Sequence, residues 1–408
     1  MTTMADNKDK KVLNVPHLRF PEFSGEWEEI TLGKISEITK GSGISKDQLS
    51  EQGSPCILYG ELYTKYKSEI IDVVYSRTEL ESSSLVKSKA NDVIIPCSGE
   101  TAIDISTARC VPFNNILLGG DLNIIRLKHD DGGFFAYQLN GARKKDIARV
   151  AQGVSVVHLY GENLKHIRVY HPAIEEQKKI TRLLSLMDER IATQNKIIED
   201  LKKLKSAISK YLFARKDLLE TTICLSNIAT LKNGYAFQSG KYNALGKWKI
   251  LTITNVSGER YINDEDYNCI INLPNDIQDH QVLKEGDILI SLTGNVGRVS
   301  LCKDGDYLLN QRVGLLQLAK NVNQEFLYQI LSSQRFENSM IACGQGAAQM
   351  NIGKGDVESY VLPYSSNVNN ILLVAKILHS YDEYIINEQR KLTLLTMQKQ
   401  YFLAQMFI

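Results

Sequence analysis

The chain has 408 residues, of which 43% are hydrophobic and 23% are charged, a length and composition that suit two or three globular domains, each with its own core. Its 48 Lys and Arg residues almost balance its 47 Asp and Glu residues, which excludes a uniformly basic surface and restricts any surface for a polyanion to local patches. The first eleven residues are polar and charged, and no apolar run reaches the roughly 18 residues of a membrane span, so we expect a cytoplasmic protein.

The seven cysteines are scattered along the chain and include no Cys-x-x-Cys pair. An odd number of separate cysteines suits reduced thiols better than a disulfide framework. We therefore expect these residues in the core of a cytoplasmic protein.

A polar tail, residues 1–20, precedes the first predicted domain, residues 21–172. This domain opens with an apolar strand at 30–41 that leads into a loop. The segment 223–234 repeats this strand 193 residues later, with its apolar residues in step and a glycine at the same end. Such self-similarity indicates a duplicated module.

Two further pairs of segments follow in the same order. An apolar strand that is entered through Asp and left through Ser or Thr and Gly occurs at 91–99 and again at 286–294, an offset of 195. Residues 135–139 likewise match residues 326–330. We therefore predict a second module of the same kind at residues 217–366.

Each module ends in about 40 residues with helical periodicity, at 173–216 and 367–408. Pro172 fixes the start of the first helix. In both helices the apolar residues alternate in steps of four and three, the seam of a coiled coil, with one polar residue at the same fifth position. The apolar seam positions are Ile180, Leu184, Met187, Ile191, Ile198 and Leu201 in the first helix, and Val374, Leu378, Tyr381, Ile385, Leu392 and Leu395 in the second.

Two interpretations of these helices remain open. Each helix packs across its own module, which is the commoner fate of an amphipathic helix, or the two helices pair with each other as a spacer. A helix of this length spans about 60 Å, more than a module of roughly 150 residues needs for its own core, and this favours the spacer. Beyond Leu201 the apolar register changes to Leu204, Ile208 and Tyr211, so the far end of the first helix either faces a different partner or has a wider apolar stripe.

The sequence contains none of the motifs that mark common catalytic sites. A phosphate-binding loop, a dinucleotide-binding Gly-x-Gly-x-x-Gly, an Asn/Asp-Pro-Pro-Tyr/Phe motif, a Gly-x-Ser-x-Gly elbow and a His-Glu-x-x-His zinc site are all missing. His158, His166 and His171 come closest to metal-ligand spacing, but no Cys or carboxylate is in register, so we interpret them as surface or structural residues.

What remains is two modules on a spacer. Reading a split DNA site requires such an arrangement, because recognition elements on one side of B-DNA are about 34 Å apart.

Three features of the chain resemble one known family, the specificity subunits of type I restriction-modification systems. They are the leading segment Pro16-His-Leu-Arg-Phe-Pro-Glu-Phe-Ser-Gly-Glu-Trp27, the repeated Asp-apolar strand with Ser/Thr-Gly, and the module exit Pro172-Ala-Ile-Glu-Glu-Gln-Lys-Lys-Ile180. The resemblance covers nearly the whole chain from about Val15 and includes the order module, helix, module, helix. The second exit departs from the pattern, with Ser366-Asn-Val-Asn-Asn370 where Glu-Gln-Lys is expected.

The resemblance implies an α+β fold of two pseudo-repeated target-recognition domains, each followed by a long helix, with the two helices packed as an antiparallel coiled coil. It also implies a non-catalytic subunit in which each module reads one half of a bipartite, asymmetric site in double-stranded DNA. The expected partners are two methyltransferase subunits, which use S-adenosylmethionine to methylate adenine N6, and restriction subunits, which translocate and cleave DNA with ATP and Mg. No cofactor or metal is expected on this chain itself.

Loops between strands are the expected place for base contacts, because they can present the bidentate groups that read base edges. Asn and Gln suit adenine and Arg suits guanine, while Lys and Arg also neutralise phosphates. The loops after Gly41 and Gly234 are equivalent but carry different side chains, as two readers of different half-sites would. The candidate DNA-binding residues are Lys40, Ser42, Lys46, Tyr59, Arg143, Lys144, Lys145 and Arg149 in the first module, and Lys232, Asn233, Tyr235, Gln238, Asn255, Thr293, Asn295, Arg298 and Arg312 in the second.

Each group of candidates also has a plainer interpretation. The basic run 143–145 suits a solvated helix face, Tyr235 and Phe237 suit a core, and the two glycine loops suit plain turns. Residues 175–216 carry eleven basic and six acidic residues, and this excess of five positive charges either faces solvent or lies along the DNA between the half-sites.

The alternative functions are a protein scaffold, a self-contained enzyme with an unrecognised centre, and a DNA-binding subunit that has no nuclease partner.

Overall fold

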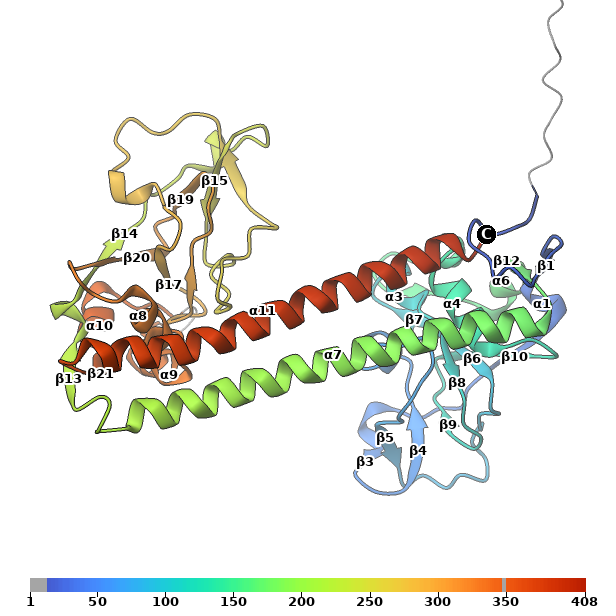
Figure 1. Cartoon of the computed structure of the whole chain (residues 1–408). Helices are drawn as coiled ribbons and strands as arrows, with labels where there is room; N and C mark the ends of the chain where they lie inside the picture. The colour runs from blue at the N-terminus through green and yellow to red at the C-terminus, as the bar shows by residue number, and fades with distance from the viewer. Residues whose placement is uncertain (1–12, 347–349) are drawn as a thin grey trace, which may run out of the picture. The chain divides into compact units, whose positions relative to one another are not determined.

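The structure, a computed structural model, describes residues 13–346 and 350–408, which form two compact units (Figure 1). Unit 1 comprises the chain up to Asn195 together with Lys391–Ile408, and unit 2 is Lys196–Arg390. Two long helices, α7 (Ile174–Ala214) and α11 (Val368–Gln405), each contribute to both units. Among the residues that the structure describes, no helix is long and apolar enough to cross a membrane.

Both units contain the same four-stranded antiparallel sheet, in the order β2-β10-β6-β8 in unit 1 and β14-β20-β17-β18 in unit 2. A two-stranded pair, β1-β12 or β13-β21, joins the first strand of each module to its last. The strands of unit 1 are β1 (Glu28–Thr31), β2 (Ser36–Lys40), β6 (Asp92–Pro96), β8 (Arg109–Val111), β10 (Leu122–Leu127) and β12 (Arg168–His171). Those of unit 2 are β13 (Thr221–Cys224), β14 (Ala229–Asn233), β17 (Ile288–Ser291), β18 (Val299–Leu301), β20 (Val313–Leu318) and β21 (Val361–Tyr364).

The strand predicted at residues 30–41 is interrupted. A helical turn, α1 (Leu32–Ile35), separates β1 from β2, because both of its terminal residues are buried and a strand would turn residues three apart to opposite faces. A 3-10 turn, η2 (Leu225–Asn227), has the same place in unit 2. The prediction of one continuous strand is therefore wrong here, whereas β6 and β17 confirm the strands predicted at 91–99 and 286–294.

The two units differ in their second sheet. Unit 1 has four strands in the order β3-β5-β4-β9, and unit 2 has three in the order β16-β15-β19. A small pair, β7 (Ser98–Gly99) with β11 (Val157–His158), completes unit 1. The strands of the second sheets are β3 (Leu49–Ser50), β4 (Ser54–Ile57), β5 (Ser76–Thr78) and β9 (Leu117–Leu118) in unit 1, and β15 (Trp248–Leu251), β16 (Asn268–Ile270) and β19 (Tyr307–Leu309) in unit 2.

Short helices complete each unit. The repeated segments 135–139 and 326–330 lie in α4 and α8, which begin at equivalent caps, since Asp131 accepts from Phe134 N and Asn323 from Phe326 N. The helices are α2 (Glu61–Thr64), α3 (Ala102–Ile105), α4 (Gly132–Asn140), α5 (Lys144–Val150) and α6 (Gly161–Lys165) in unit 1, and α8 (Gln324–Leu331), α9 (Gln334–Cys343) and α10 (Lys354–Glu358) in unit 2, with 3-10 turns η1 (Lys46–Gln48), η3 (Ser239–Lys241) and η4 (Asp279–Gln281).

The end of a long helix completes the core of each unit. In unit 1 the ring of Phe407, just beyond α11, lies 6.4 Å from the ring of Trp27 and 5.2 Å from that of Phe134. In unit 2 the equivalent residue, 194 positions earlier, is Phe213 at the end of α7, which joins the main apolar cluster. Residues 13–20, expected to belong to a polar tail, pack beside the C-terminus, where Leu18 N donates to Gln405 O at 2.8 Å.

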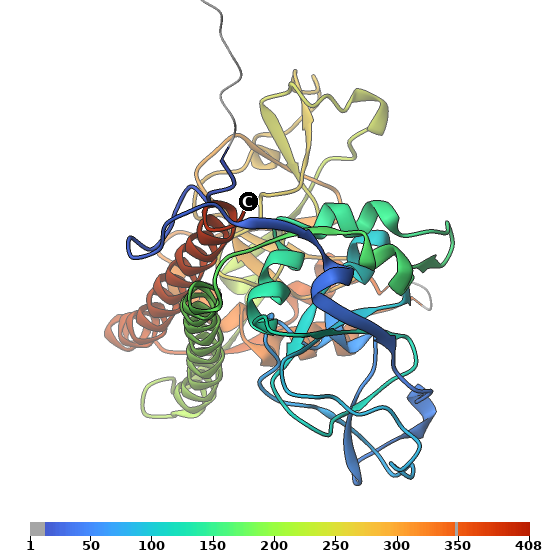
Figure 2. The same ribbon diagram turned by 90° about the vertical axis from the view of Figure 1, so that its right-hand side faces the viewer.

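All twelve predicted apolar seam residues of the long helices are buried or half-buried. The first two on each helix belong to the core of the preceding module, so packing of each helix on its own module holds for that stretch. Farther along, Asp188 contacts Lys399 in unit 1 and Lys205 contacts Asp382 in unit 2, so residue numbers fall on one helix as they rise on the other. The two helices are therefore antiparallel and pack against each other, as Figures 1 and 2 both show.

Some large or reactive side chains lie on the surface. Of the residues in the changed register, Leu204 and Tyr211 are exposed, whereas Ile208 is half-buried and packs against the core of unit 2, as do Leu212 and Phe213 at the end of α7. Beyond Leu201 the changed register therefore contributes Ile208 to that core. Cys343 is also exposed, at the end of α9, so the expectation that every cysteine lies in a core is wrong for this residue.

Replacing Phe407 with Ala is expected to destabilise unit 1 by about 3–5 kcal/mol, the usual cost of a Phe-sized cavity in a core, and to leave unit 2 intact. The matched variant Phe213→Ala should destabilise unit 2 and leave unit 1 intact. Hydrogen exchange followed by mass spectrometry would compare amide protection in β10 and β20. Equal loss of protection in both strands for either variant would contradict this assignment.

Candidate nucleic-acid interface

Each module leaves its four-stranded sheet at a glycine. Just after Gly41 the chain bridges to Gly119, and just after Gly234 it bridges to Asn310, in both cases with parallel strands. A Cβ at Gly41 would lie 1.9 Å from the Gly119 carbonyl oxygen, and a Cβ at Gly234 would lie 2.1 Å from that of Asn310. Only glycine permits this close approach of two backbones. The two glycines therefore do more than form plain turns, because they join the first sheet to the second at the same point in both modules.

An open pocket of about 910 Å³ lies beyond Gly41 in unit 1. Two of the candidate DNA-binding residues, Lys46 and Tyr59, line it. Helix α2 contributes Glu61 and its C-cap residue Lys65, whose Nζ lies 2.6 Å from Glu61 Oε1. The pocket thus combines an exposed cation, a half-buried aromatic ring and an ion pair.

A smaller pocket of about 430 Å³ lies at the equivalent place in unit 2. Tyr235 and Phe237, whose ring centroids are 4.8 Å apart, line it as half-buried wall residues. The Tyr235 hydroxyl donates to Asp276 Oδ1 at 2.8 Å, which fixes the ring at the rim. The polar side chains that line the pocket are Gln238, Lys241, Tyr242, Asn243, Asn272 and Asn275.

Sequence reasoning identified only part of these two linings. It missed Lys65 in unit 1 and Asn243, Asn272 and Asn275 in unit 2. Pairing of β15 with β16 brings the segment after β16 to the glycine loop, and this pairing is not evident from local sequence. The available signal was the Asn-Leu-Pro-Asn stretch at 272–275, since such turn-forming residues keep their amides on a loop surface.

The basic run of the first module lies on α5, and none of its four candidates lines the pocket. Arg143 donates to the carbonyl oxygen of Ile408 and so holds the C-terminus of the chain. Burial lowers the pKa of Lys144. Lys145 and Arg149 are exposed. The run therefore has a structural part at its start and a solvated part farther on.

The remaining candidates lie outside the pockets. Asn255 is 2% exposed, and its amide donates to the carbonyl oxygens of Asn263 and Asp266 at 2.8 Å each, so it supports its own loop. In unit 1, Lys40 is exposed and Ser42 accepts a hydrogen bond from Val86 N at 2.8 Å. In unit 2, Lys232, Thr293 and Arg298 are half-buried, whereas Asn233, Asn295 and Arg312 are exposed.

Within residues 13–346 and 350–408, no three His, Cys, Asp or Glu side chains are grouped as metal ligands. His171 instead has a structural partner, with its Nδ1 3.2 Å from Asp130 Oδ1. This hydrogen bond raises the pKa of the imidazole.

Comparison with known proteins matches both modules to one family. The family described as "type I restriction modification DNA specificity domain" matches residues 24–203 and 220–397. The MjaVIII specificity subunit of a type I restriction enzyme from Methanocaldococcus jannaschii is 25% identical over 361 residues, which cover 82% of this chain and 80% of that protein. The putative MjaX specificity subunit of the same organism is 26% identical over 271 residues, 62% of this chain and 61% of that protein.

Solved structures share the fold. The crystal structure of a type I restriction-modification S subunit from M. genitalium superposes with a TM-score of 0.62 at 17% identity and covers 97% of this chain and 99% of its own. A chain from a study of complex assembly and conformational transition in the type I system gives a TM-score of 0.56 at 14% identity, with 93% and 97% covered. Because the family match extends over both modules and most of both long helices, this chain belongs to the type I restriction-modification DNA specificity family.

Proposed function

We propose that this chain is the non-catalytic specificity subunit of a type I restriction-modification complex, and that each module reads one half of a bipartite, asymmetric DNA site. The observation that carries the proposal is the pattern of likeness between the modules. Each module contains a four-stranded sheet of the same strand order, which the chain leaves at a glycine that closely approaches a neighbouring backbone. The modules differ in the second sheet and in the pocket beyond that glycine. Two domains that recognise different DNA sequences from the same fold need a common scaffold and different binding surfaces.

The chemistry of the two pockets differs in the way that reading different bases requires. The lining in unit 2 is rich in amides, among them Gln238 and Asn275, and an amide can form two hydrogen bonds with the edge of an adenine. The lining in unit 1 instead offers Lys46, Lys65 and Tyr59. Lysine can donate to guanine or to a phosphate, and tyrosine can also donate to a phosphate oxygen. Arg312 and Asn295 are also exposed in unit 2, and we include them among its candidate DNA contacts.

Catalysis in this proposal belongs to the partners. Two methyltransferase subunits would bind S-adenosylmethionine and methylate adenine N6, and restriction subunits would use ATP and Mg to translocate and cleave DNA in the cytoplasm. The sequence of this chain contributes none of the corresponding motifs. The family match supports this division of roles, because the family is defined by DNA specificity.

The experiment that tests the function is a genome-wide map of N6-methyladenine by single-molecule sequencing, in the host with and without this gene. Methylation at one bipartite, asymmetric motif that disappears on deletion is the expected result. An unchanged methylation map would overturn the proposal and favour a protein scaffold.

Replacing Gln238 with Ala is expected to weaken binding to the cognate duplex by about 1–3 kcal/mol, or roughly 5- to 150-fold, and to relax selection at one base pair of one half-site, because the amide that reads a base edge is lost. Fluorescence anisotropy of the chain with its methyltransferase subunits would measure this on the cognate duplex and its single-base variants. The control is Asn338→Ala, an exposed amide on α9 that lines neither pocket. An equal loss of affinity for every duplex would argue against base reading by Gln238.

Lys46→Ala and Arg143→Met are expected to separate a phosphate contact from a structural cation. Lys46→Ala should reduce the slope of log K against log salt by about one. Arg143→Met should leave that slope unchanged and lower the unfolding midpoint of unit 1, because the contact with Ile408 is lost. Salt titrations and thermal unfolding of the same preparations measure both effects. If Arg143→Met changed the slope of log K against log salt, the basic run at α5 would belong to the DNA interface after all.

A further inference from the structure

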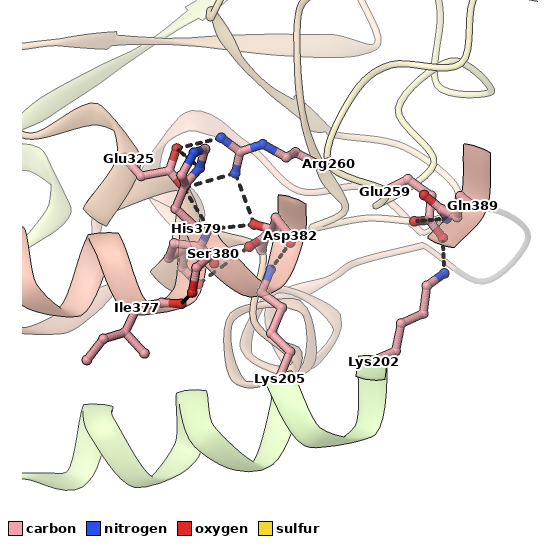
Figure 3. Close-up of polar contacts among 12 residues, drawn as sticks. Lys202, Lys205, Glu259, Arg260, Glu325, Ile377, His379, Ser380, Asp382 and Gln389 are labelled. Carbon is pink, nitrogen blue, oxygen red and sulfur yellow. Dashed lines mark hydrogen bonds and ion pairs between the residues drawn. The ribbon is translucent and has the colours of Figure 1, made fainter. Parts of the chain in front are cut away.

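A buried polar cluster in unit 2 joins both long helices to the module (Figure 3). At its centre is Asp382 of α11, which is 6% exposed. Its Oδ1 lies 2.5 Å from Lys205 Nζ of α7, and its Oδ2 accepts from Arg260 at 3.0 Å and from Gln329 Nε2 of α8 at 2.6 Å. One carboxylate therefore joins α11 to three other segments of the chain.

Arg260 is the module's contribution to this cluster. It comes from the connection between β15 and β16, and its guanidinium also donates two hydrogen bonds to Glu325, at 2.9 and 2.6 Å. Burial alone would lower the pKa of Arg260, but the hydrogen bonds to Glu325 raise it overall. Burial would likewise raise the pKa of Glu325, and Arg260 lowers it overall. Both groups are therefore charged at neutral pH.

Unit 1 contains a counterpart at the repeated positions. Asp188 of α7 has its Oδ1 2.5 Å from Lys399 Nζ of α11, and it accepts a hydrogen bond from the Tyr137 hydroxyl of α4 at 2.7 Å. Adding 194 to Asp188 and to Lys205 gives Asp382 and Lys399. The same Asp–Lys pair thus occurs in each unit, with the two helices exchanging roles.

The side chain that the second-sheet segment contributes to the cluster has the opposite charge in the two units. In unit 1 an acid, Glu69, lies 2.6 Å from Lys399, whereas in unit 2 a base, Arg260, contacts Asp382. Glu69 lies between α2 and β5, so both side chains come from the segment that also builds the divergent second sheet. The part of each module that differs most therefore contributes one charged side chain to the repeated Asp–Lys pair.

A buried ion pair contributes little net stability compared with apolar residues, but separating its partners is costly, because each charge that stays buried is then uncompensated. Apolar contacts are not directional, so an apolar seam by itself specifies the register of two helices less strictly than an ion pair does. Moving a module or a helix by one turn would instead leave an aspartate and a lysine buried without partners. Each cluster thus selects one arrangement of its module on its two helix segments.

We propose that the two Asp–Lys clusters are positioning sites, which fix the angle of each module on its helices and thereby restrict the subunit to one number of base pairs between the half-sites. The proposal rests on the proposed function. One base pair changes the separation by only about 3.4 Å and also rotates one half-site around the duplex axis, so a small loss of angular precision changes the accepted gap.

The test uses the complete chain with its methyltransferase subunits and a plasmid library in which the two half-sites are separated by the native gap or by one base pair more or fewer. Lys205→Met is the informative variant, because Asp382 keeps its contacts with Arg260 and Gln329 and unit 2 is therefore expected to fold. The matched control is Lys202→Met, less than one turn away, whose ion pair with Glu259 at 2.6 Å is largely exposed.

Lys205→Met should raise methylation at the neighbouring gaps, relative to the native gap, about fivefold or more. Lys202→Met and the conservative variant Lys205→Arg should keep the native ratio. A uniform loss of methylation at all gaps would show that the cluster is only structural and would overturn the proposal. If the wild-type subunit directed methylation to no bipartite site at all, the proposed function itself would fail, and this outcome is visible before any variant is compared.

Lys399→Met should behave differently, because it leaves Asp188 and Glu69 as two buried carboxylates beside the Tyr137 hydroxyl, with the buried Arg109 guanidinium as the cation that still attracts both. Loss of one partner of a buried pair should lower the unfolding midpoint of unit 1 by roughly 10 °C at pH 8. Burial, followed by Glu69, already raises the pKa of Asp188 with Lys399 present. A raised folded pKa means that stability is greatest at low pH and is lost as the pH rises through that pKa.

The unfolding midpoint of Lys399→Met should therefore rise as the pH is lowered from 8 toward 5, and the double variant Lys399→Met with Glu69→Gln should regain most of the lost stability at pH 8. Differential scanning calorimetry between these pH values measures both effects. A midpoint that is independent of pH would contradict a charged cluster at Asp188.

Discussion

Burial of one aromatic residue at the end of each long helix is the constraint on which the rest of the structure depends. Helix α7 starts on the first module and ends with Phe213 in the core of unit 2, while α11 starts on the second module and ends with Phe407 in the core of unit 1. Neither module can complete its core from its own stretch of sequence. Both helices must therefore be present, and because one leaves the unit that the other enters, they must run antiparallel.

Much of this fold is predictable from sequence because it depends on periodicity and duplication. The offsets of 191 to 195 residues identify the repeated strands and α4 with α8, and the steps of four and three identify the seam. Two features are not predictable in this way. The helical turn α1 interrupts an apolar run that reads equally well as one strand. The burial of Phe407 depends on a partner, Trp27, some 380 residues away, which a periodic pattern cannot specify.

The candidate site was predictable where a local constraint acts on one position. Gly41 and Gly234 are evident from sequence because they end the repeated apolar segments, and Lys46 and Gln238 follow within their loops, while Tyr59 lies just after β4. The amides after β16 reach the same pocket only through strand pairing, which local sequence does not encode. A basic run is ambiguous for a related reason: the charge of Arg143 is equally suited to a phosphate and to the carbonyl of Ile408, and only the tertiary fold distinguishes the two partners.

The Asp–Lys pair of each unit offers both an anion and a cation to the segment that carries the second sheet. An incoming acid can dock on the lysine, as Glu69 does, and an incoming base can dock on the aspartate, as Arg260 does. The same Asp–Lys pair thus suits segments of unrelated sequence, provided that each segment has one acidic or basic side chain in contact with the pair. During evolution, recombination could exchange the segments between β2 and β6 or between β14 and β17 and change the target while leaving the assembly of the chain untouched. Selection for new targets and selection for assembly then act on separate stretches of the gene.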